Sequence, residues 1–262
     1  MSLTEAQIKA LAEAYLGAEE QRTPLEPLSI SQPELTAEEA YRVQEAIVAH
    51  KLGSGEQVSG MKVGATNPAI QKMLGVDSPV YGTLFRSSQV EDGGSVRMDG
   101  LIHPRVECEI AFRLGRDLAG SGVTEADALA ATESVLASLE INDARTREWK
   151  IGERELIADN GVVARFVLGE AGVSPQGLDL AALGVVLRKN GEEVATARGE
   201  AVLGHPARAV AWLANKLAET GRRLSAGMII LPGSLTPLAA VVAGDAIEAE
   251  FERLGRVRVR FE

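Results

Sequence analysis

The spacing of apolar residues predicts amphipathic helices at the start of the chain. Residues 4–7 and 36–39 each carry a threonine followed three positions later by glutamine or glutamate, the capping-box pattern that opens a helix. Apolar residues then recur at helical spacing in both segments, and Gly53 is expected to end the second helix. Three further helices are predicted: a short one that begins at Asn67-Pro68 and ends at Gly75, and two over about 124–137 and 206–221.

Strand patterns dominate the rest of the chain. Short apolar runs alternate with turn sequences, and the segment 183–196 turns at Asn190-Gly191, a dipeptide typical of a two-residue hairpin. Residues 247–252 and 256–261 alternate apolar and polar positions, as strands with one solvated face do. Helices first, and then many strands with a few helices between them, predict an α+β fold with a β-rich core.

One strand pattern, at residues 103–112, places two acids on the same side. Successive strand side chains point to opposite faces, so Glu107 and Glu109 share one face while the apolar residues around them share the other. Two carboxylates held close raise each other's pKa unless a cation neutralises them, and a divalent metal bound by carboxylate oxygens does this. The alternative is that both acids form the solvated face of a half-buried strand.

Composition and charge narrow the choice of partners. With 262 residues, 45% of them hydrophobic and 24% charged, the chain is long enough to bury a substantial core and has an ordinary globular composition. The formal net charge of -10 argues against nucleic acid or an anionic membrane surface as a partner.

The counts of metal-binding side chains favour oxygen ligands. The single cysteine, Cys108, excludes an internal disulfide and a cysteine-rich zinc site, and the 3 histidines show no metal-ligand spacing. A lone cysteine also fits a reducing compartment. We find no signal peptide and no apolar run of transmembrane length, so we expect a cytoplasmic protein.

A third acid follows in the segment 139–145, where a predicted helix gives way to an apolar strand. Glu140 is the first candidate for a third metal ligand, and Asp143 is the second. For Asp143 the alternative is an ion pair with Arg145 or Arg147.

Two cations also stand inside apolar strands. Lys62 lies between Gly60 and Gly64, where it is either a proton carrier or anion-binding cation, or a lysine whose ammonium reaches solvent from an edge strand. Arg165 needs a partner for its charge, which is either a substrate carboxylate or a structural aspartate.

Six motifs occur in one order along the chain. They are the glycines around Lys62, the Glu107-x-Glu109 pair, Glu140 before Asp143-Ala144-Arg145, Ala158-Asp159-Asn160, Leu203-Gly204-His205-Pro206, and Gly233-Ser234-Leu235-Thr236. In this order they resemble the hydratase and decarboxylase family of meta-cleavage pathways, within the fumarylacetoacetate hydrolase superfamily. The resemblance runs from about Thr36 to the C-terminus.

The resemblance implies a fumarylacetoacetate hydrolase-like β-rich roll, with an N-terminal helical part over residues 1–70 and a catalytic domain over 71–262. It also implies a homo-oligomer that binds Mg²⁺ or Mn²⁺ and a small 2-oxo acid. By position, the resemblance makes Glu107, Glu109 and Glu140 the metal ligands, and Lys62 the residue that moves a proton near the substrate. It implies further substrate contacts for Val80, Asp159, Asn160, Arg165, Ser234 and Thr236.

Val80 favours one of the two reactions of this family. The family's hydratases resemble one another in an aspartate at this position, which can direct a water, whereas its decarboxylases have an aliphatic residue there. We therefore expect a lyase of aromatic catabolism that decarboxylates 4-oxalocrotonate through a metal-bound dienolate, with Arg165 meeting the second carboxylate. The alternative is a 2-hydroxypenta-2,4-dienoate (2-keto-4-pentenoate) hydratase, which residues 73–76, 149–151 and 233–235 resemble more closely.

Some positions depart from both branches of the family. Ala65, Gly161, Val162 and Pro232 replace the residues that are usual there, and the last two changes remove donors that would hold a substrate. These departures motivate a second alternative, a non-catalytic binder of 2-oxo acids. Hydrolysis of a carbon-carbon bond in an acylpyruvate is disfavoured, because the sequence shows no evident His-Glu pair to direct a water.

Overall fold

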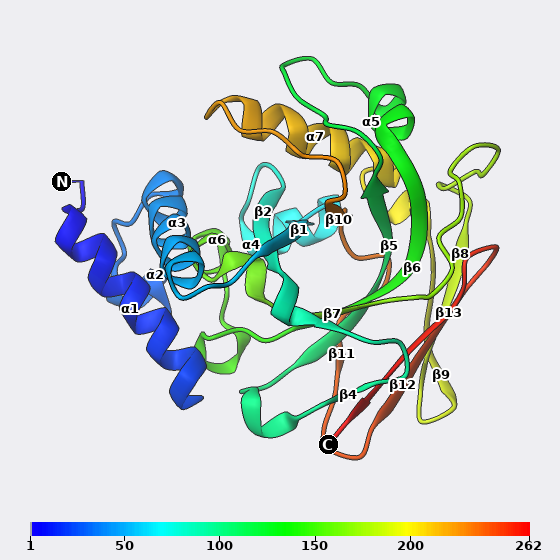
Figure 1. Cartoon of the computed structure of the whole chain (residues 1–262). Helices are drawn as coiled ribbons and strands as arrows, with labels where there is room; N and C mark the ends of the chain where they lie inside the picture. Colours follow the sequence, from blue (N-terminus) through cyan, green and yellow to red (C-terminus); the bar gives the residue numbers. More distant parts are fainter. Residues whose placement is uncertain (1) are drawn as a thin grey trace.

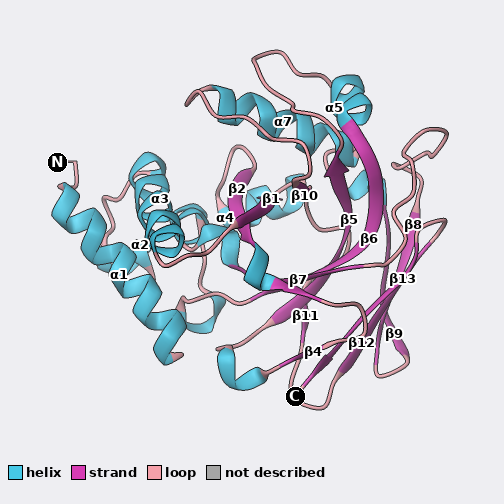
Figure 2. Ribbon diagram, viewed as in Figure 1, coloured by secondary structure: helices cyan, strands magenta, loops and turns pink. Residues whose placement is uncertain are grey.

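A computed structural model describes residues 2–262 of the chain (Figures 1 and 2). The α-helices are α1 (Glu5–Gln21), α2 (Leu28–Ser31), α3 (Ala37–Gly53), α4 (Pro68–Leu74), α5 (Glu125–Ala131), α6 (Glu153–Ala158) and α7 (Pro206–Ala218). The strands are β1 (Val58–Gly64), β2 (Val80–Phe85), β3 (Gln89–Val90), β4 (Ser95–Val96), β5 (Arg105–Leu114), β6 (Thr132–Asn142), β7 (Val163–Leu168), β8 (Gly184–Lys189), β9 (Glu192–Arg198), β10 (Ile229–Leu231), β11 (Ala239–Ala240), β12 (Ala246–Phe251) and β13 (Gly255–Phe261). Short 3₁₀ turns include η3 (Arg147–Trp149) and η4 (Asn160–Val162). Within the described residues, none of these helices is both long enough and apolar enough to cross a membrane.

Helices α1 and α3 lie side by side at one end of the molecule, at the left of Figure 1. Thr4 caps α1 and Thr36 caps α3, each with the complete capping box that the sequence predicts. Tyr15 of α1 and Val43 of α3 share a buried apolar cluster with Leu156 of α6. This cluster joins the N-terminal helices to the region that follows β6.

The larger sheet has eight strands, in the order β2-β1-β10-β5-β6-β7-β3, with β11 paired to the start of β5. Its long central strands β5 and β6 are antiparallel and strongly curved (Figure 2). The short turn η4 lies against β2, because the Asn160 side chain accepts a hydrogen bond from the Thr83 N–H and donates one to the Thr83 carbonyl. The sheet therefore curls into a roll whose concave face is enclosed.

A second sheet of five strands, in the order β4-β13-β12-β8-β9, packs on the outer face of the first. The main core lies between the sheets, where Cys108, Ile110 and Phe112 of β5 belong to one cluster with Ala249 and Val257 of the second sheet. Burying one such large apolar side chain contributes about 1.5–3 kcal/mol. Two sheets with helices at their margins confirm the predicted α+β fold with a β-rich core.

The observed elements correct one prediction. The hairpin around Asn190-Gly191 and the two C-terminal strands are present as predicted. The helix expected over about 124–137 instead ends at Ala131, and β6 begins at Thr132. Strand β6 pairs with β5, and residues 134–142 are buried on both faces of the sheet. Packing in the sheet therefore overrides the helical tendency of this alanine-rich segment.

The boundary at residue 70 stays a prediction. The N-terminal helices end at Gly53, and β1, which precedes residue 70, already pairs with β2 and β10 in the larger sheet.

Candidate active site

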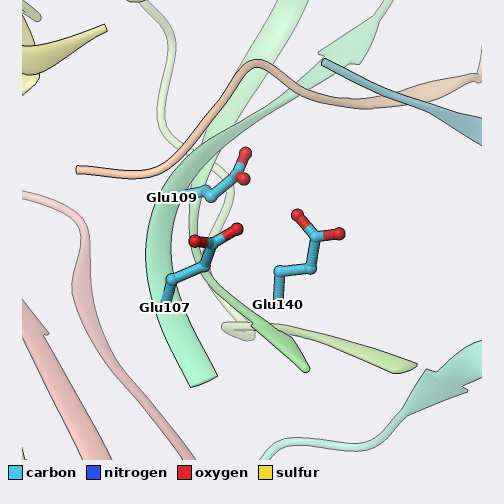
Figure 3. A group of neighbouring side chains, drawn as sticks. All are labelled: Glu107, Glu109 and Glu140. Carbon is cyan, nitrogen blue, oxygen red and sulfur yellow. The ribbon is translucent and has the colours of Figure 1, made fainter. Parts of the chain in front are cut away.

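Three glutamates meet on the concave face of the larger sheet (Figure 3). Glu107 and Glu109 project from β5, and Glu140 projects from β6, directly opposite Glu107 in the antiparallel register. Cross-strand partners share a face of the sheet, so all three side chains point the same way. One oxygen from each carboxylate lies within 4.8 Å of the others, and all three residues are buried. The solvated-strand alternative for these acids is therefore wrong, since Glu109 has 0% of its surface exposed.

Lys62 reaches the same cluster from β1. Its Nζ lies 3.2 Å from Glu140 Oε1 and donates a hydrogen bond to the Gly161 carbonyl at 3.0 Å. Burial opposes the charge of the ammonium, but the nearby Glu140, Glu107 and Glu109 outweigh it and raise the pKa of Lys62 above its usual value. Lys62 is therefore a buried ammonium, and its side chain does not reach solvent.

The charges of the cluster are not balanced by the protein. Burial, followed by the charge of Glu140, raises the pKa of Glu107 to about 7, and burial with both neighbouring carboxylates raises the pKa of Glu109 well above its usual value. When all three glutamates are ionised, three carboxylates and one ammonium leave two negative charges, which a divalent cation would balance. Within residues 2–262, Glu109 Oε1 and Glu140 Oε2 are buried without a hydrogen-bond donor, and Glu140 Oε1 has only the Lys62 ammonium, at 3.2 Å. Oxygen donors of this kind suit a hard divalent ion.

The raised pKa values predict how the metal-free protein responds to pH. Folded Glu107 holds its proton to about pH 7, whereas an unfolded glutamate loses it near 4.5. Raising the pH from about 5 to about 8 therefore ionises groups whose charged form the fold disfavours, and the free energy of unfolding should fall. Thermal unfolding of the metal-free protein should show a falling Tm over this range, with Mg²⁺ restoring it at the higher pH. The Glu107→Gln/Glu109→Gln double variant is the control and should show a smaller fall; an equal fall would contradict this origin of the effect.

Two neighbours fix the carboxylates in place. The Gly233 N–H donates to Glu109 Oε2 at 2.8 Å, and Asn142 Nδ2 donates to Glu107 Oε1 at 2.9 Å. Sequence reasoning missed Asn142, although its position two residues after Glu140 on the same strand was a usable signal.

Ser234 and Thr236 lie in the loop that follows β10. Thr236 Oγ1 accepts a hydrogen bond from the Cys108 N–H at 3.1 Å, and Ser234 Oγ donates to the Thr236 carbonyl at 2.6 Å. Ser234 also lowers the pKa of Glu107, against the larger effects of burial and of Glu140. The structure thus brings Ser234 beside the cluster, while the hydroxyl of Thr236 is engaged with the backbone of β5.

Val80 is brought to the same face as Lys62. Gly64 is two residues after Lys62 in β1 and pairs with Val80 of β2, so all three share one side of the sheet. A Cβ at Gly64 would lie 3.3 Å from Val80 Cγ2 and 3.6 Å from Lys62 Nζ. Val80 therefore forms an apolar wall near the ammonium.

The other acids near the site are engaged in structural contacts. Asp159 Oδ1 lies 2.6 Å from Arg145 Nε, and its other oxygen accepts from the Arg145 N–H at 2.7 Å. The Asp143 carboxylate accepts from the backbone N–H groups of Ile102 and His103, each at 2.8 Å. In the described part of the chain, Asp143 therefore belongs neither to the glutamate cluster nor to a side-chain ion pair, and Glu140 is the third acid. Asn160 holds β2, as described above.

Arg165 is not brought to the cluster. It pairs with Ile141, whereas its neighbour Phe166 pairs with Glu140, so Arg165 points to the opposite face of the sheet from the glutamates. Its Nη1 donates to the Ala164 carbonyl at 2.7 Å. The substrate contact implied for Arg165 stays a prediction without support from this geometry.

A β-rich roll with buried carboxylates and a buried ammonium on its concave face defines a class of protein with a candidate divalent-metal centre. The chain belongs to the fumarylacetoacetate hydrolase family, because the family described as fumarylacetoacetate (FAA) hydrolase C-terminal matches residues 46–262.

Similar proteins include both reaction types. A 2-hydroxyhexa-2,4-dienoate hydratase of Comamonas testosteroni is 44% identical over 259 residues, which are 98% of this chain and 97% of the relative. A 4-oxalocrotonate decarboxylase of Pseudomonas sp. (strain CF600) is 40% identical over 260 residues, 99% of this chain and 98% of the relative. The structure of 4-oxalocrotonate decarboxylase from Pseudomonas putida G7, complexed with magnesium and adipate, superposes with a TM-score of 0.97 at 39% identity, covering 100% of this chain and 99% of that chain.

These similarities confirm the predicted family and its fold. They also confirm that the protein is an enzyme of the lyase type, since the full-length relatives are named as hydratases and decarboxylases. They do not separate the two reactions.

Proposed function

We propose that the protein is a divalent-metal-dependent lyase that decarboxylates 4-oxalocrotonate (2-oxo-3-hexenedioate). The observation that carries this proposal is the apolar wall at Val80, which is 2% exposed and shares a sheet face with Lys62. A carboxylate that leaves as carbon dioxide loses its charge, so an apolar surface beside it favours departure.

The engagement of nearby acids supports the same reaction. Hydration requires a base that directs a water. Asp159 is paired with Arg145, and Glu155 accepts hydrogen bonds from the Ser29 and Gly152 N–H groups at 2.8 and 2.9 Å. Each of these acids already has its donors, which leaves Lys62 as the proton-carrying group beside the glutamates.

Glu107, Glu109 and Glu140 would hold the divalent ion, and Mg²⁺ and Mn²⁺ both accept carboxylate oxygens. When bound, such an ion supplies Lewis-acid stabilisation of negative charge on the 2-oxo group. The three acids do not need to change protonation during the reaction.

Lys62 moves the proton. When the bond between C5 and C6 of the substrate breaks, its electron pair delocalises through the conjugated chain to the oxygen on C2. The Lys62 ammonium can then donate its proton to that oxygen, which gives 2-hydroxypenta-2,4-dienoate and carbon dioxide. Glu140, at 3.2 Å, and the Gly161 carbonyl fix the direction of the ammonium.

The second candidate function is hydration of 2-hydroxypenta-2,4-dienoate, and the 44% identity to a dienoate hydratase favours it. The two reactions are separated by measuring kcat/KM for 4-oxalocrotonate, followed by carbon dioxide release, and for 2-hydroxypenta-2,4-dienoate, both with Mg²⁺. We expect decarboxylation to be faster. Hydration without carbon dioxide release would reject the first proposal, and binding of 2-oxo acids without turnover of either substrate would favour a non-catalytic binder.

Val80→Asp should lower kcat/KM for decarboxylation by about 10- to 100-fold, because a carboxylate in the apolar wall opposes the approach of the leaving carboxylate. Val80→Asn is the matched control for polarity without charge, and Val80→Leu is the control for an intact apolar wall, which should retain activity. Progress curves at fixed Mg²⁺ measure the effect. Equal rates for the Asp and Leu variants would contradict a role of the wall in decarboxylation.

Assembly as a homo-oligomer stays a prediction of the family resemblance, and location in the cytoplasm stays a prediction from the sequence.

A further inference from the structure

Arg105 lies at the outer end of the strand face that carries the glutamates. It is two residues before Glu107 in β5 and pairs with Asn142, which is two residues after Glu140 in β6. Because cross-strand partners and every second residue share a face, Arg105 extends the row of acids outward by one step of about 7 Å.

The guanidinium of Arg105 lies over an aromatic ring. Its Cζ lies 4.4 Å from the ring centroid of Trp149, a cation–π arrangement. The Trp149 indole is itself fixed, since Nε1 donates to the His103 carbonyl at 2.9 Å. Glu148 and Trp149 both have left-handed backbone angles, with φ of 57° and 56°. Such angles are uncommon for residues other than glycine, and they occur in the turn that carries the indole.

The charge of Arg105 has no acidic partner. Over residues 2–262, no carboxylate forms an ion pair with it, although the buried Arg145 is paired with Asp159 and the exposed Arg97 with Asp99. Arg105 is also half-buried, so water satisfies only part of its five donors. An ordered, unpaired guanidinium beside a ligand site is suited to bind a planar anion through two parallel hydrogen bonds.

The position of Arg105 decides which anion it meets. Lys62 and Val80 approach the glutamates from β1 and β2, whereas Arg105 approaches from the start of β5. If the leaving carboxylate lies against the Val80 wall, the other end of the substrate lies toward β5. We propose that Arg105 binds the substrate carboxylate adjacent to the 2-oxo group, with the Trp149 ring against its guanidinium. This inference rests on the proposed 2-oxo acid substrate.

The test is calorimetric binding of 2-oxobutanoate, which has one carboxylate, to the Mg²⁺-loaded protein. Arg105→Met keeps the apolar stem over Trp149 and removes the charge, and it should weaken binding by about 10- to 100-fold. Arg260→Met is the matched control, because Arg260 is exposed on β13 of the second sheet, and it should bind as wild type does. Mg²⁺ affinity of Arg105→Met should not weaken, since a positive charge near the ligands has been removed.

Further variants separate binding from packing. Arg105→Lys should recover part of the lost affinity, because an ammonium keeps the charge but not the planar fork. If Arg105→Met does not fold, Arg105→Lys against wild type still tests the proposal, through a loss of about 3- to 10-fold.

The outcomes are distinct. If wild type binds no 2-oxo acid, the proposed function fails and this inference fails with it. If wild type binds 2-oxobutanoate and the Arg105 variants bind it equally well, only this inference is overturned. If Arg105→Met weakens binding of adipate but not of 2-oxobutanoate, the guanidinium meets the distal carboxylate and the assignment made here is wrong.

Discussion

Glu109→Gln should lower metal-dependent kcat/KM by about 10³-fold or more, the largest effect expected for a single substitution in this protein. Glu109 is fully buried, and none of the described residues provides a donor to its Oε1. Glutamine keeps the side-chain shape and an oxygen that accepts from the Gly233 N–H, but it removes the charge that holds a divalent ion. Calorimetric titration with Mg²⁺ and the turnover assay should both show the loss.

The control for this variant is Glu133→Gln, which changes an exposed acid on β6, the strand that carries Glu140. It should bind Mg²⁺ and turn over substrate as wild type does. In the metal-free state, Glu109→Gln should unfold at a higher temperature than wild type above pH 7, because it removes a buried carboxyl group whose ionised form the fold disfavours. Wild-type Mg²⁺ affinity in Glu109→Gln would show that the site lies elsewhere.

Lys62→Met is expected to have the second largest effect, a fall in kcat of about 10²- to 10⁴-fold, the usual contribution of a positioned proton donor. Methionine fills a similar volume, so the apolar contacts of β1 are kept. Mg²⁺ should bind at least as tightly as to wild type, because the competing ammonium at 3.2 Å from Glu140 has been removed. A loss of turnover without a loss of metal affinity separates proton transfer from metal binding.

Lys72→Met is the matched control, since Lys72 is exposed on α4, ten residues further along the chain. It should leave kcat unchanged. If Lys62→Met also retains wild-type kcat at saturating Mg²⁺, Lys62 has no part in the reaction.

Much of the site could be predicted from strand periodicity. Alternation alone places Glu107 and Glu109 on one face, because the side-chain period of a strand does not depend on the rest of the fold. The convergence of Glu140 depends on the register between β5 and β6, which pairs it directly with Glu107. Local sequence does not specify that register, so Glu140 and Asp143 were both candidates until the strands were paired.

The surroundings of Arg165 and Arg105 also depend on strand pairing and tertiary contacts that local sequence does not specify. Arg165 was a reasonable candidate because a charged residue in an apolar strand needs a partner. The face to which it points follows from its pairing with Ile141, next to an irregularity in the register. Arg105 lies two residues before Glu107 in the sequence, but its contact with the Trp149 ring joins residues far apart in the chain. Local sequence does not predict such a contact.

Polar residues near the site were harder to assign. Asp159 and Asn160 resemble substrate contacts in sequence, but in the fold they hold Arg145 and β2. Asp143 likewise satisfies two backbone N–H groups before β5. Buried backbone donors must be paired, and which of them lack a strand partner becomes known only from the three-dimensional structure.

The central claim is that Glu107, Glu109 and Glu140 together bind one divalent ion. Anomalous diffraction from crystals grown with Mn²⁺ tests this most directly. The account predicts one strong anomalous peak between the three carboxylates, within about 2.0–2.3 Å of an oxygen of each. A protein with full Mn²⁺-dependent activity but no peak there, or with its peak at other residues, would contradict the account.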